Sequence, residues 1–136
     1  MCGIFGYVGN KSDTAQMVLD GLKTLEYRGY DSWGISVKHD KQITSEKHVG
    51  KIGDATTALP SSSLGIGHTR WETHGGVTME NAHPHTNKNK TIAVVHNCII
   101  ENFSEIKQKL QKIFLVAFSF LTIMAAWLPV QSQKQN

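Results

Sequence analysis

The chain has 136 residues, of which 40% are hydrophobic, and its 14 Lys and Arg against 11 Asp and Glu give a formal net charge of +3 at pH 7. This length suits one domain or part of one. A mild positive charge without a dense basic stripe argues against nucleic-acid binding, so we expect no nucleic-acid partner. The two cysteines, Cys2 and Cys98, form no disulfide framework, and no basic-then-apolar signal segment opens the chain. We therefore expect a cytoplasmic protein.

The first predicted elements are a strand and a helix. Residues 3–8, GIFGYV, are typical of a short strand, and residues 13–27 are typical of an amphipathic helix. Asp13 stands at the expected N-cap, with Gln16 three residues later as in a capping box. The predicted apolar stripe consists of Ala15, Val18, Leu22 and Leu25.

A hairpin and a further strand follow. YRGYDSWG at 27–34 is predicted to be a loop, and ISVK and QITSEKHV flank the turn-like HDK at 39–41, which predicts a hairpin. After a loop at 58–63, LGIGH at 64–68 reads as a strand. Strands in pairs with helices between them indicate an α+β fold.

The last third of the chain combines a long polar loop with the strongest strand pattern. Residues 69–90 are rich in His and Gly and lack periodicity, and a loop of that length usually has a function. TIAVVHNCII at 91–100 predicts a buried strand because of its β-branched run. A helix is expected from about Asn102, with Phe103, Ile106 and Leu110 on one face.

The second residue raises the first question of chemistry. Cys2 could be a small apolar residue at the start of a strand. Alternatively, removal of Met1 would give a residue that carries both a thiol and a free α-amine, which places a nucleophile and a base together.

HTRWETHGG at 68–76 is a second candidate site. Arg70 offers a planar fork suited to a carboxylate, Thr73 offers a hydroxyl, and Gly75 and Gly76 allow backbone amides to approach a ligand. This set fits the capture of an amino-acid α-carboxylate. The alternative is a solvated loop with an incidental arginine.

Two further patterns carry weaker information. His83 and His85 in NAHPH are spaced as metal ligands can be, but no third ligand of matching character stands out, so we expect no metal. Asn97 ends the 91–100 strand, where its amide could donate a hydrogen bond to a developing oxyanion. Asparagine also ends many strands without a catalytic role.

Five motifs in this order, MCGIFGYVG, LEYRGYDSWG, HTRWETHG, NAHPH and VVHNCIIEN, resemble the glutaminase domain of the glutamine–fructose-6-phosphate aminotransferases. The resemblance runs from residue 1 to about residue 112. It implies a class II glutamine amidotransferase with a partial N-terminal-nucleophile hydrolase αββα sandwich. In that family the domain releases ammonia from glutamine for a sugar-phosphate isomerase domain, which makes glucosamine 6-phosphate from fructose 6-phosphate in hexosamine biosynthesis.

The resemblance implies a catalytic set and a substrate-binding set. Cys2 resembles the nucleophile that forms a glutamyl thioester, Asn97 the oxyanion donor, and Cys98 the residue whose backbone amide completes the oxyanion hole. The residues implied in substrate binding and positioning are Arg70, Thr73, His74 through its backbone, Trp71 as the aromatic that helps link the two activities, and Arg28 near the nucleophile.

The resemblance also sets expectations for partners. Glutamine is the implied substrate, no cofactor is implied, and the family is usually homo-oligomeric. No sugar-phosphate isomerase domain is present in this chain, and we expect no membrane partner. The predicted domains are an incomplete glutamine amidotransferase domain at 2–112 and an atypical apolar tail at 113–136. The tail is interpreted as a truncation or frameshift product, with a membrane tail and a buried core segment as alternatives.

Departures from the family pattern keep other functions open. The family has glycine at Cys98, small residues at Trp33 and Glu72, and proline at Val77, and its SETDTE-like stretch is missing. A second hypothesis is therefore a catalytically silent remnant that still binds glutamine. A third is a small membrane-anchored protein that uses residues 113–130.

Overall fold

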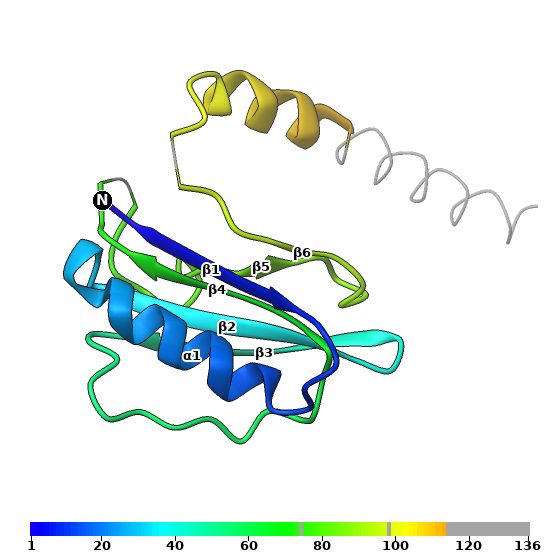
Figure 1. Ribbon diagram of the computed structural model, residues 1–136. Helices are drawn as coiled ribbons and strands as arrows, with labels where there is room; N and C mark the ends of the chain where they lie inside the picture. Colours follow the sequence, from blue (N-terminus) through cyan, green and yellow to red (C-terminus); the bar gives the residue numbers. More distant parts are fainter. Residues whose placement is uncertain (74, 98, 114–136) are drawn as a thin grey trace, which may run out of the picture. The chain divides into compact units, whose positions relative to one another are not determined.

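A four-stranded antiparallel sheet forms the centre of residues 1–98, with the strand order β1-β4-β2-β3 (Figure 1). The computed structural model describes residues 1–73, 75–97 and 99–113. These residues belong to two units, 1–98 and 99–136, which are described separately below. The sheet consists of β1 (Gly3–Val8), β2 (Ser32–His39), β3 (Gln42–Val49) and β4 (Leu64–Arg70).

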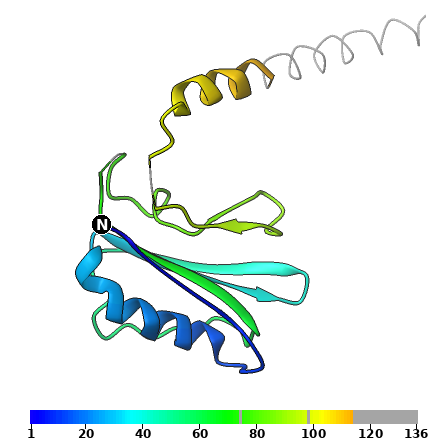
Figure 2. The same cartoon turned by 45° about the horizontal axis from the view of Figure 1, so that its top comes forward.

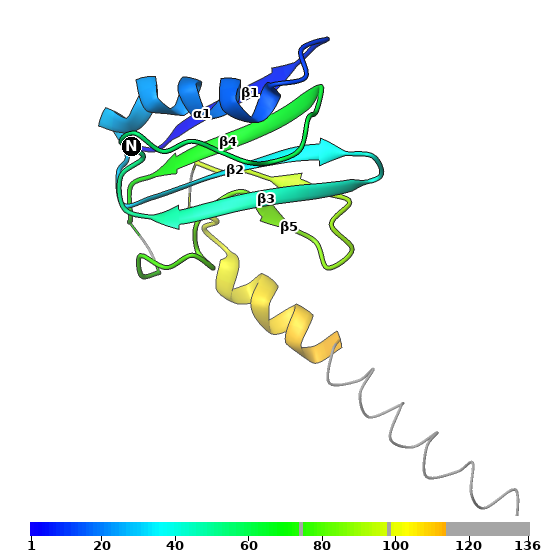
Figure 3. The same ribbon diagram turned by 90° about the horizontal axis from the view of Figure 1, so that it is seen from below.

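Helix α1 (Thr14–Leu25) covers one face of this sheet (Figure 3). Because side chains alternate along a strand, every second residue of β2 points at the helix. The resulting core holds Ala15, Val18, Leu19 and Leu22 of α1 with Trp33, Ile35 and Val37 of β2. On β4 the residues facing α1 include Gly65 and Gly67, where a Cβ atom would meet Val18. The predicted apolar stripe is thus confirmed at Ala15, Val18 and Leu22, whereas Leu25 is only half-buried. Leu19 is also buried in the core, although the predicted stripe did not include it.

The predicted capping box at the start of α1 is wrong. Asp13 is the N-cap residue, but its side chain makes no capping hydrogen bond, and Gln16 donates to Asp20 instead. The buried Thr14 hydroxyl contacts the carbonyls of Lys11 and Ser62. A tertiary contact to the loop before β4 therefore positions this helix end, which a local sequence motif cannot reveal.

The β2–β3 hairpin is confirmed, but β2 begins three residues earlier than the sequence predicts. Residues 32–34, predicted as the end of a loop, pair on one side with Val49 to Lys47 and on the other with Arg70 to His68. Pairing with two neighbouring strands outweighs the turn propensity of this segment. Asp40 in the hairpin turn has a φ of 52°, a conformation that Asp tolerates better than most residues.

The predicted buried strand at 91–100 is wrong. Only β6 (Ala93–Val94) forms there, paired with β5 (His85–Thr86). Ile92 and Val94 are 58% and 53% exposed, so a β-branched run that suits a buried strand lies largely in solvent. A long buried strand needs neighbours on both edges, and among the described residues β6 pairs only with the two residues of β5. The β5–β6 ribbon lies on the sheet face opposite α1 (Figure 2).

The second unit contributes one described element, a helix over residues 103–113. The apolar residues predicted on one face of it, Phe103, Ile106 and Leu110, are all exposed. Most of the predicted apolar tail lies outside the described residues. Among the residues that are described, no helix is both long and apolar enough to cross a membrane. The arrangement of helices and strands confirms the α+β prediction.

Candidate active site

Cys2 immediately precedes β1 and lies beside Trp71, the residue that follows β4. The antiparallel register pairs Gly3 with Thr69, which brings Cys2 next to Trp71 although the two are 69 residues apart in the chain. The Trp71 amide donates to the Cys2 sulfur at 3.3 Å, and the thiol donates to the Trp71 carbonyl at 3.7 Å. The backbone of β4 thus holds the sulfur at the edge of the 68–76 motif.

Two side chains from distant segments hold the Cys2 carbonyl. Arg28 Nε donates to it at 3.3 Å, and Asn97 Nδ2 donates to it at 3.3 Å. Arg28 ends the short 3₁₀ helix η1 (Glu26–Arg28), which follows α1 directly. Three of the residues predicted from the sequence therefore meet at one point. Two hydrogen bonds to one carbonyl fix the backbone of Cys2, which orients its thiol.

Arg70 is 8% exposed and holds the loop at 75–81. Its guanidinium donates through Nη2 to the Gly75 carbonyl at 2.9 Å and through Nη1 to the Gly76 carbonyl at 3.1 Å. Asn81 Nδ2 also donates to the Gly76 carbonyl, at 3.0 Å. Gly75 has a φ of 70°, which favours glycine. The planar fork of Arg70 therefore fixes the backbone of this loop at its two glycines.

Trp71 is 40% exposed, and its ring makes an edge contact with Tyr30 at a centroid distance of 5.2 Å. Lys51 in turn lies 5.6 Å from the Tyr30 centroid. Thr73 is exposed. The two remaining predicted site residues, His74 and Cys98, lie outside the described residues.

Sequence reasoning missed two residues that help to build this site. A Cβ atom at Gly29 would lie 2.7 Å from the Arg70 carbonyl carbon and 2.8 Å from the Trp71 nitrogen, so only glycine fits there. Thr69 accepts a hydrogen bond at 3.0 Å from the Gly3 amide through its hydroxyl. Gly29 lies inside the quoted LEYRGYDSWG motif, but a close approach of two backbones leaves no pattern in a sequence.

Trp33, one of the departures from the family pattern, belongs to the core beneath α1. It is 3% exposed and stacks on His48 with a centroid distance of 4.5 Å. Glu72, another departure, uses its backbone amide to bind the Asp31 carboxylate at 2.7 Å. Val77 is 36% exposed in the loop at 75–81.

Three histidines form a cluster close to Arg70. The His68 and His83 ring centroids are 4.5 Å apart, and those of His83 and His85 are 4.3 Å apart. Burial, together with the neighbouring imidazoles and Arg70, lowers the pKa of His68 to about 3 and the pKa of His83 to about 4. All of these rings are therefore uncharged at neutral pH. Among the described residues, no group of three or more His, Cys, Asp or Glu side chains is placed to hold a metal ion.

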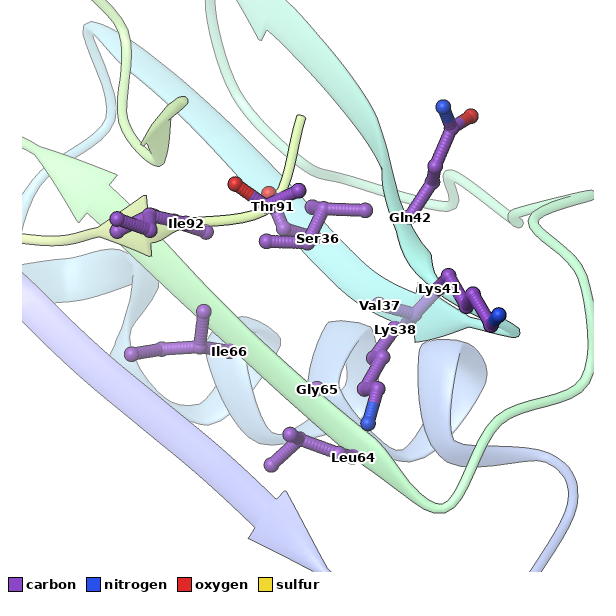
Figure 4. A pocket seen from close by; sticks show the side chains of 12 residues that line it. Ser36, Val37, Lys38, Lys41, Gln42, Leu64, Gly65, Ile66, Thr91 and Ile92 are labelled. Atoms are coloured by element: carbon purple, nitrogen blue, oxygen red, sulfur yellow. The ribbon is translucent and has the colours of Figure 1, made fainter. Parts of the chain in front are cut away.

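A pocket of about 380 Å³ lies away from Cys2, where residues 91–93 approach the sheet (Figure 4). Its lining is mostly apolar and includes Ile43, Leu64, Ile66 and Ile92. Leu64 and Arg70 are at opposite ends of β4, roughly 20 Å apart at the rise of an extended strand. This pocket is therefore separate from the site around Cys2.

Among curated proteins, the chain is similar to glutamine–fructose-6-phosphate aminotransferases. The chain is 52% identical over 120 residues to a glutamine–fructose-6-phosphate aminotransferase (isomerizing) of Corynebacterium efficiens, a match that covers 81% of this chain. It is 49% identical to the enzyme of that name from Clostridium perfringens and 51% identical to the one from Aquifex aeolicus, each over 116 residues and 82% of this chain. The matches cover 19% of each relative, so the chain spans about a fifth of their length. A scan against protein-family models finds no match.

Two solved structures have a fold similar to that of this chain. The glutamine phosphoribosylpyrophosphate amidotransferase of B. subtilis, in complex with ADP and GMP, matches with a TM-score of 0.66 and 26% identity over 80% of this chain and 24% of that one. A structure described as the allosteric regulatory enzyme of purine biosynthesis matches with a TM-score of 0.69 and 28% identity, over 80% of this chain and 25% of its own. The chain is thus related in sequence to the glutamine–fructose-6-phosphate aminotransferases and in fold to the N-terminal-nucleophile amidotransferases, as the five motifs predict.

Proposed function

We propose that this chain is part of a glutaminase in which Cys2, after removal of Met1, attacks the side-chain carboxamide of glutamine. The observation that carries the proposal is the convergence of Arg28, Asn97 and the Trp71 backbone on Cys2. These three groups come from three separate segments of the chain, and all of them act on one residue. A cysteine that merely begins a strand needs no such arrangement.

The thiol and the α-amine of Cys2 carry the chemistry. The sulfur adds to the carboxamide carbon while the α-amine takes the thiol proton and delivers it to the departing nitrogen. Ammonia leaves, and a glutamyl thioester remains on Cys2. Water then hydrolyses the thioester to glutamate and regenerates the thiol. A free α-amine has a pKa of about 7.7–8.0 in model compounds, so it can act as a base near neutral pH.

The surroundings of Cys2 support this assignment. Met1 is 79% exposed, which leaves its peptide bond to Cys2 accessible to removal. Asn97 already lies within hydrogen-bond distance of the Cys2 backbone, so its amide is close to where the tetrahedral oxygen would develop. We assign the backbone amide of Cys98 to the same oxyanion hole.

The loop that starts at Arg70 is the proposed glutamine-binding element. Arg70 supplies the positive charge for the α-carboxylate, with Thr73 and the His74 backbone as further partners. The guanidinium already donates to two loop carbonyls, so it holds the loop in place, and its positive charge lies beside that loop. Trp71, at the Cys2 sulfur, is the proposed link to a second catalytic domain.

In the complete protein, the ammonia would serve an aminotransferase reaction on a sugar phosphate, as the name of the curated relatives implies. That reaction requires a domain beyond the part that this chain shares with them. Fructose 6-phosphate as acceptor, glucosamine 6-phosphate as product and the usual homo-oligomer are therefore proposals for the longer protein.

The test is covalent labelling by a glutamine analogue that carries an electrophile in place of the carboxamide. The variant Cys98→Gly, which leaves Cys2 as the one thiol, should acquire one label, and peptide mapping should place it on Cys2. Cys2→Ala is the matched control and should acquire none. Labelling of Cys2→Ala at the same rate would contradict the proposal, and an unlabelled but correctly folded Cys98→Gly chain would favour a catalytically silent remnant.

A further inference from the structure

The histidine cluster lies where the loop at 75–81 rejoins the sheet. His68 is a central residue of β4, opposite Gly34 of β2, and it is fully buried. A Cβ atom at Gly34 would collide with the His83 carbonyl oxygen, so the backbone of His83 rests directly on the sheet there. Ala82 and Pro84 on either side of His83 are also buried. The segment at 82–85 is thus docked on β2 and β4 through the His83 backbone and through the tilted and edge-to-face contacts of the histidine rings.

Three buried ring nitrogens of this contact make no hydrogen bond to the part of the chain that the structure describes. These are the two ring nitrogens of His68 and the Nδ1 atom of His83. The rings meet each other instead, at centroid distances of 4.5 and 4.3 Å. Buried polar groups are normally satisfied, so this unsatisfied cluster needs a reason.

We propose that His68, His83 and His85 form an imidazole latch that positions the loop at 75–81 against the sheet when the rings are uncharged and releases it when they are protonated. The loop is continuous with the docked segment, and the Ala82 amide closes it by donating to the Thr78 carbonyl at 3.1 Å. Arg70 holds the other end of the loop through the Gly75 and Gly76 carbonyls. The latch and Arg70 therefore fix the same loop from its two ends.

The positively charged groups around the cluster oppose protonation of the three imidazole rings. Arg70 on β4, Lys47 on β3 and His96 after β6 each lower the pKa of at least one ring, and burial has the largest effect on all three. The acidic group close to these cations is Glu80, which interacts with Lys47 and is itself exposed. No buried carboxylate among the described residues compensates a charged imidazole.

The direction of the pH effect follows from these shifts. A released histidine takes up a proton as the pH falls below about 6.5, whereas docked His83 resists until about pH 4 and docked His68 until about pH 3. Docking is therefore fully favoured above pH 6.5 and weakens as the pH falls from 6.5 toward 4. At pH 5, proton uptake by each of these two rings would raise the equilibrium constant for release of the segment by about thirtyfold.

Amide hydrogen exchange followed by NMR on the full chain tests the latch without reference to catalysis. The protection factor of the Ala82 amide, corrected for intrinsic exchange, should fall at least thirtyfold between pH 7 and pH 5, whereas that of the Ile35 amide in β2 should change little. Gly34→Ala should lower the protection factor of the Ala82 amide already at pH 7, because the added Cβ displaces His83. His39→Gln, at an exposed histidine in the β2–β3 hairpin, is the control and should behave as the unaltered chain does.

Titration of the histidine ring protons in the unaltered chain provides the second measurement, which does not depend on any variant. In the docked form, which remains the major species, His68 and His83 should stay uncharged at pH 5, because only the minor released form takes up protons there. If both titrate near 6.5 while Ala82 stays protected, or if Ala82 loses protection only together with Ile35, the proposal is wrong. The latch does not rest on the proposed function, so a chain that never reacts with glutamine would leave this result intact.

Discussion

At the scale of single residues, the site is built around backbone atoms. Arg28 and Asn97 bind the carbonyl of Cys2, and the amide of Trp71 binds its sulfur. Arg70 binds the carbonyls of Gly75 and Gly76. Side chains whose identity the motifs reveal therefore act by fixing main-chain positions.

The role of Arg70 can be separated from that of Arg28 by conservative substitution. In Arg70→Lys a point charge replaces a fork that binds two carbonyls, and charged hydrogen bonds of this kind contribute about 1.5–3 kcal/mol each. We expect the analogue concentration needed for half-maximal labelling of Cys2 to rise about tenfold or more, with a nearly unchanged limiting rate.

Arg28→Lys is the comparison for that measurement. Its partner is the Cys2 carbonyl, which a lysine can still reach with one donor, so the limiting rate should fall more than the half-maximal concentration rises. The opposite pattern, in which Arg70→Lys abolishes the limiting rate at an unchanged half-maximal concentration, would show that Arg70 serves the chemical step.

At the scale of elements, the close contact of α1 with β4 depends on residues without side chains. A Cβ atom at Gly67 would lie 2.7 Å from Leu22 Cδ1 and 2.7 Å from Val18 Cγ1. Gly6 on β1 is different, because a Cβ atom there would meet only the Gly65 carbonyl oxygen at 3.6 Å. The helix can therefore approach the sheet over Gly67.

Substitution of these two glycines should have unequal effects on stability. Gly67→Ala should lower the free energy of unfolding by about 1–3 kcal/mol, because the core must shift to admit a methyl group. Gly6→Ala should change it by less than about 1 kcal/mol. Denaturant unfolding followed by circular dichroism measures both, and equal effects would show that the helix does not pack as closely as the structure indicates.

The elements that the sequence predicts well are those whose neighbours are close in the chain or whose pattern is strictly periodic. Strand β1, the β2–β3 hairpin, β4 and α1 belong to this group. The strand predicted at 91–100 is reduced to β6 because strand formation depends on partners, and among the described residues only β5 pairs with that segment. In the same way, the motifs identify Cys2, Arg28 and Asn97, whereas the close approach at Gly29 depends on how distant backbones meet.

At the scale of the whole 1–98 unit, the two faces of the sheet differ. Helix α1 covers one face (Figure 3), and on the other face apolar side chains of β1 and β4 are exposed to solvent. Ile4 and Leu64 are 44% and 45% exposed, and Val8 is 79% exposed. Exposed apolar surface of this kind promotes association, so we expect the expressed chain to be poorly soluble.

A charged pair on this surface should improve solubility without weakening the fold. Val8 and Leu64 are direct partners across β1 and β4, so Val8→Lys with Leu64→Glu places opposite charges side by side. We expect a higher soluble yield at an unfolding free energy within about 1 kcal/mol of the original. Val18→Lys, at a fully buried position beneath α1, is the control and should abolish folding. An unchanged yield for the charged pair would place the cause of poor solubility elsewhere in the chain.

The central claim is that Cys2 and the loop following Arg70 together form a glutamine site. Its most direct test is the rate at which iodoacetamide alkylates Cys2 in the Met1-processed chain, measured by peptide mapping with and without glutamine. Glutamine should slow alkylation of Cys2 in a saturable manner, asparagine should protect less, and Arg70→Lys should weaken the protection. If Cys2 is alkylated at the same rate at every glutamine concentration, the account of this site is wrong.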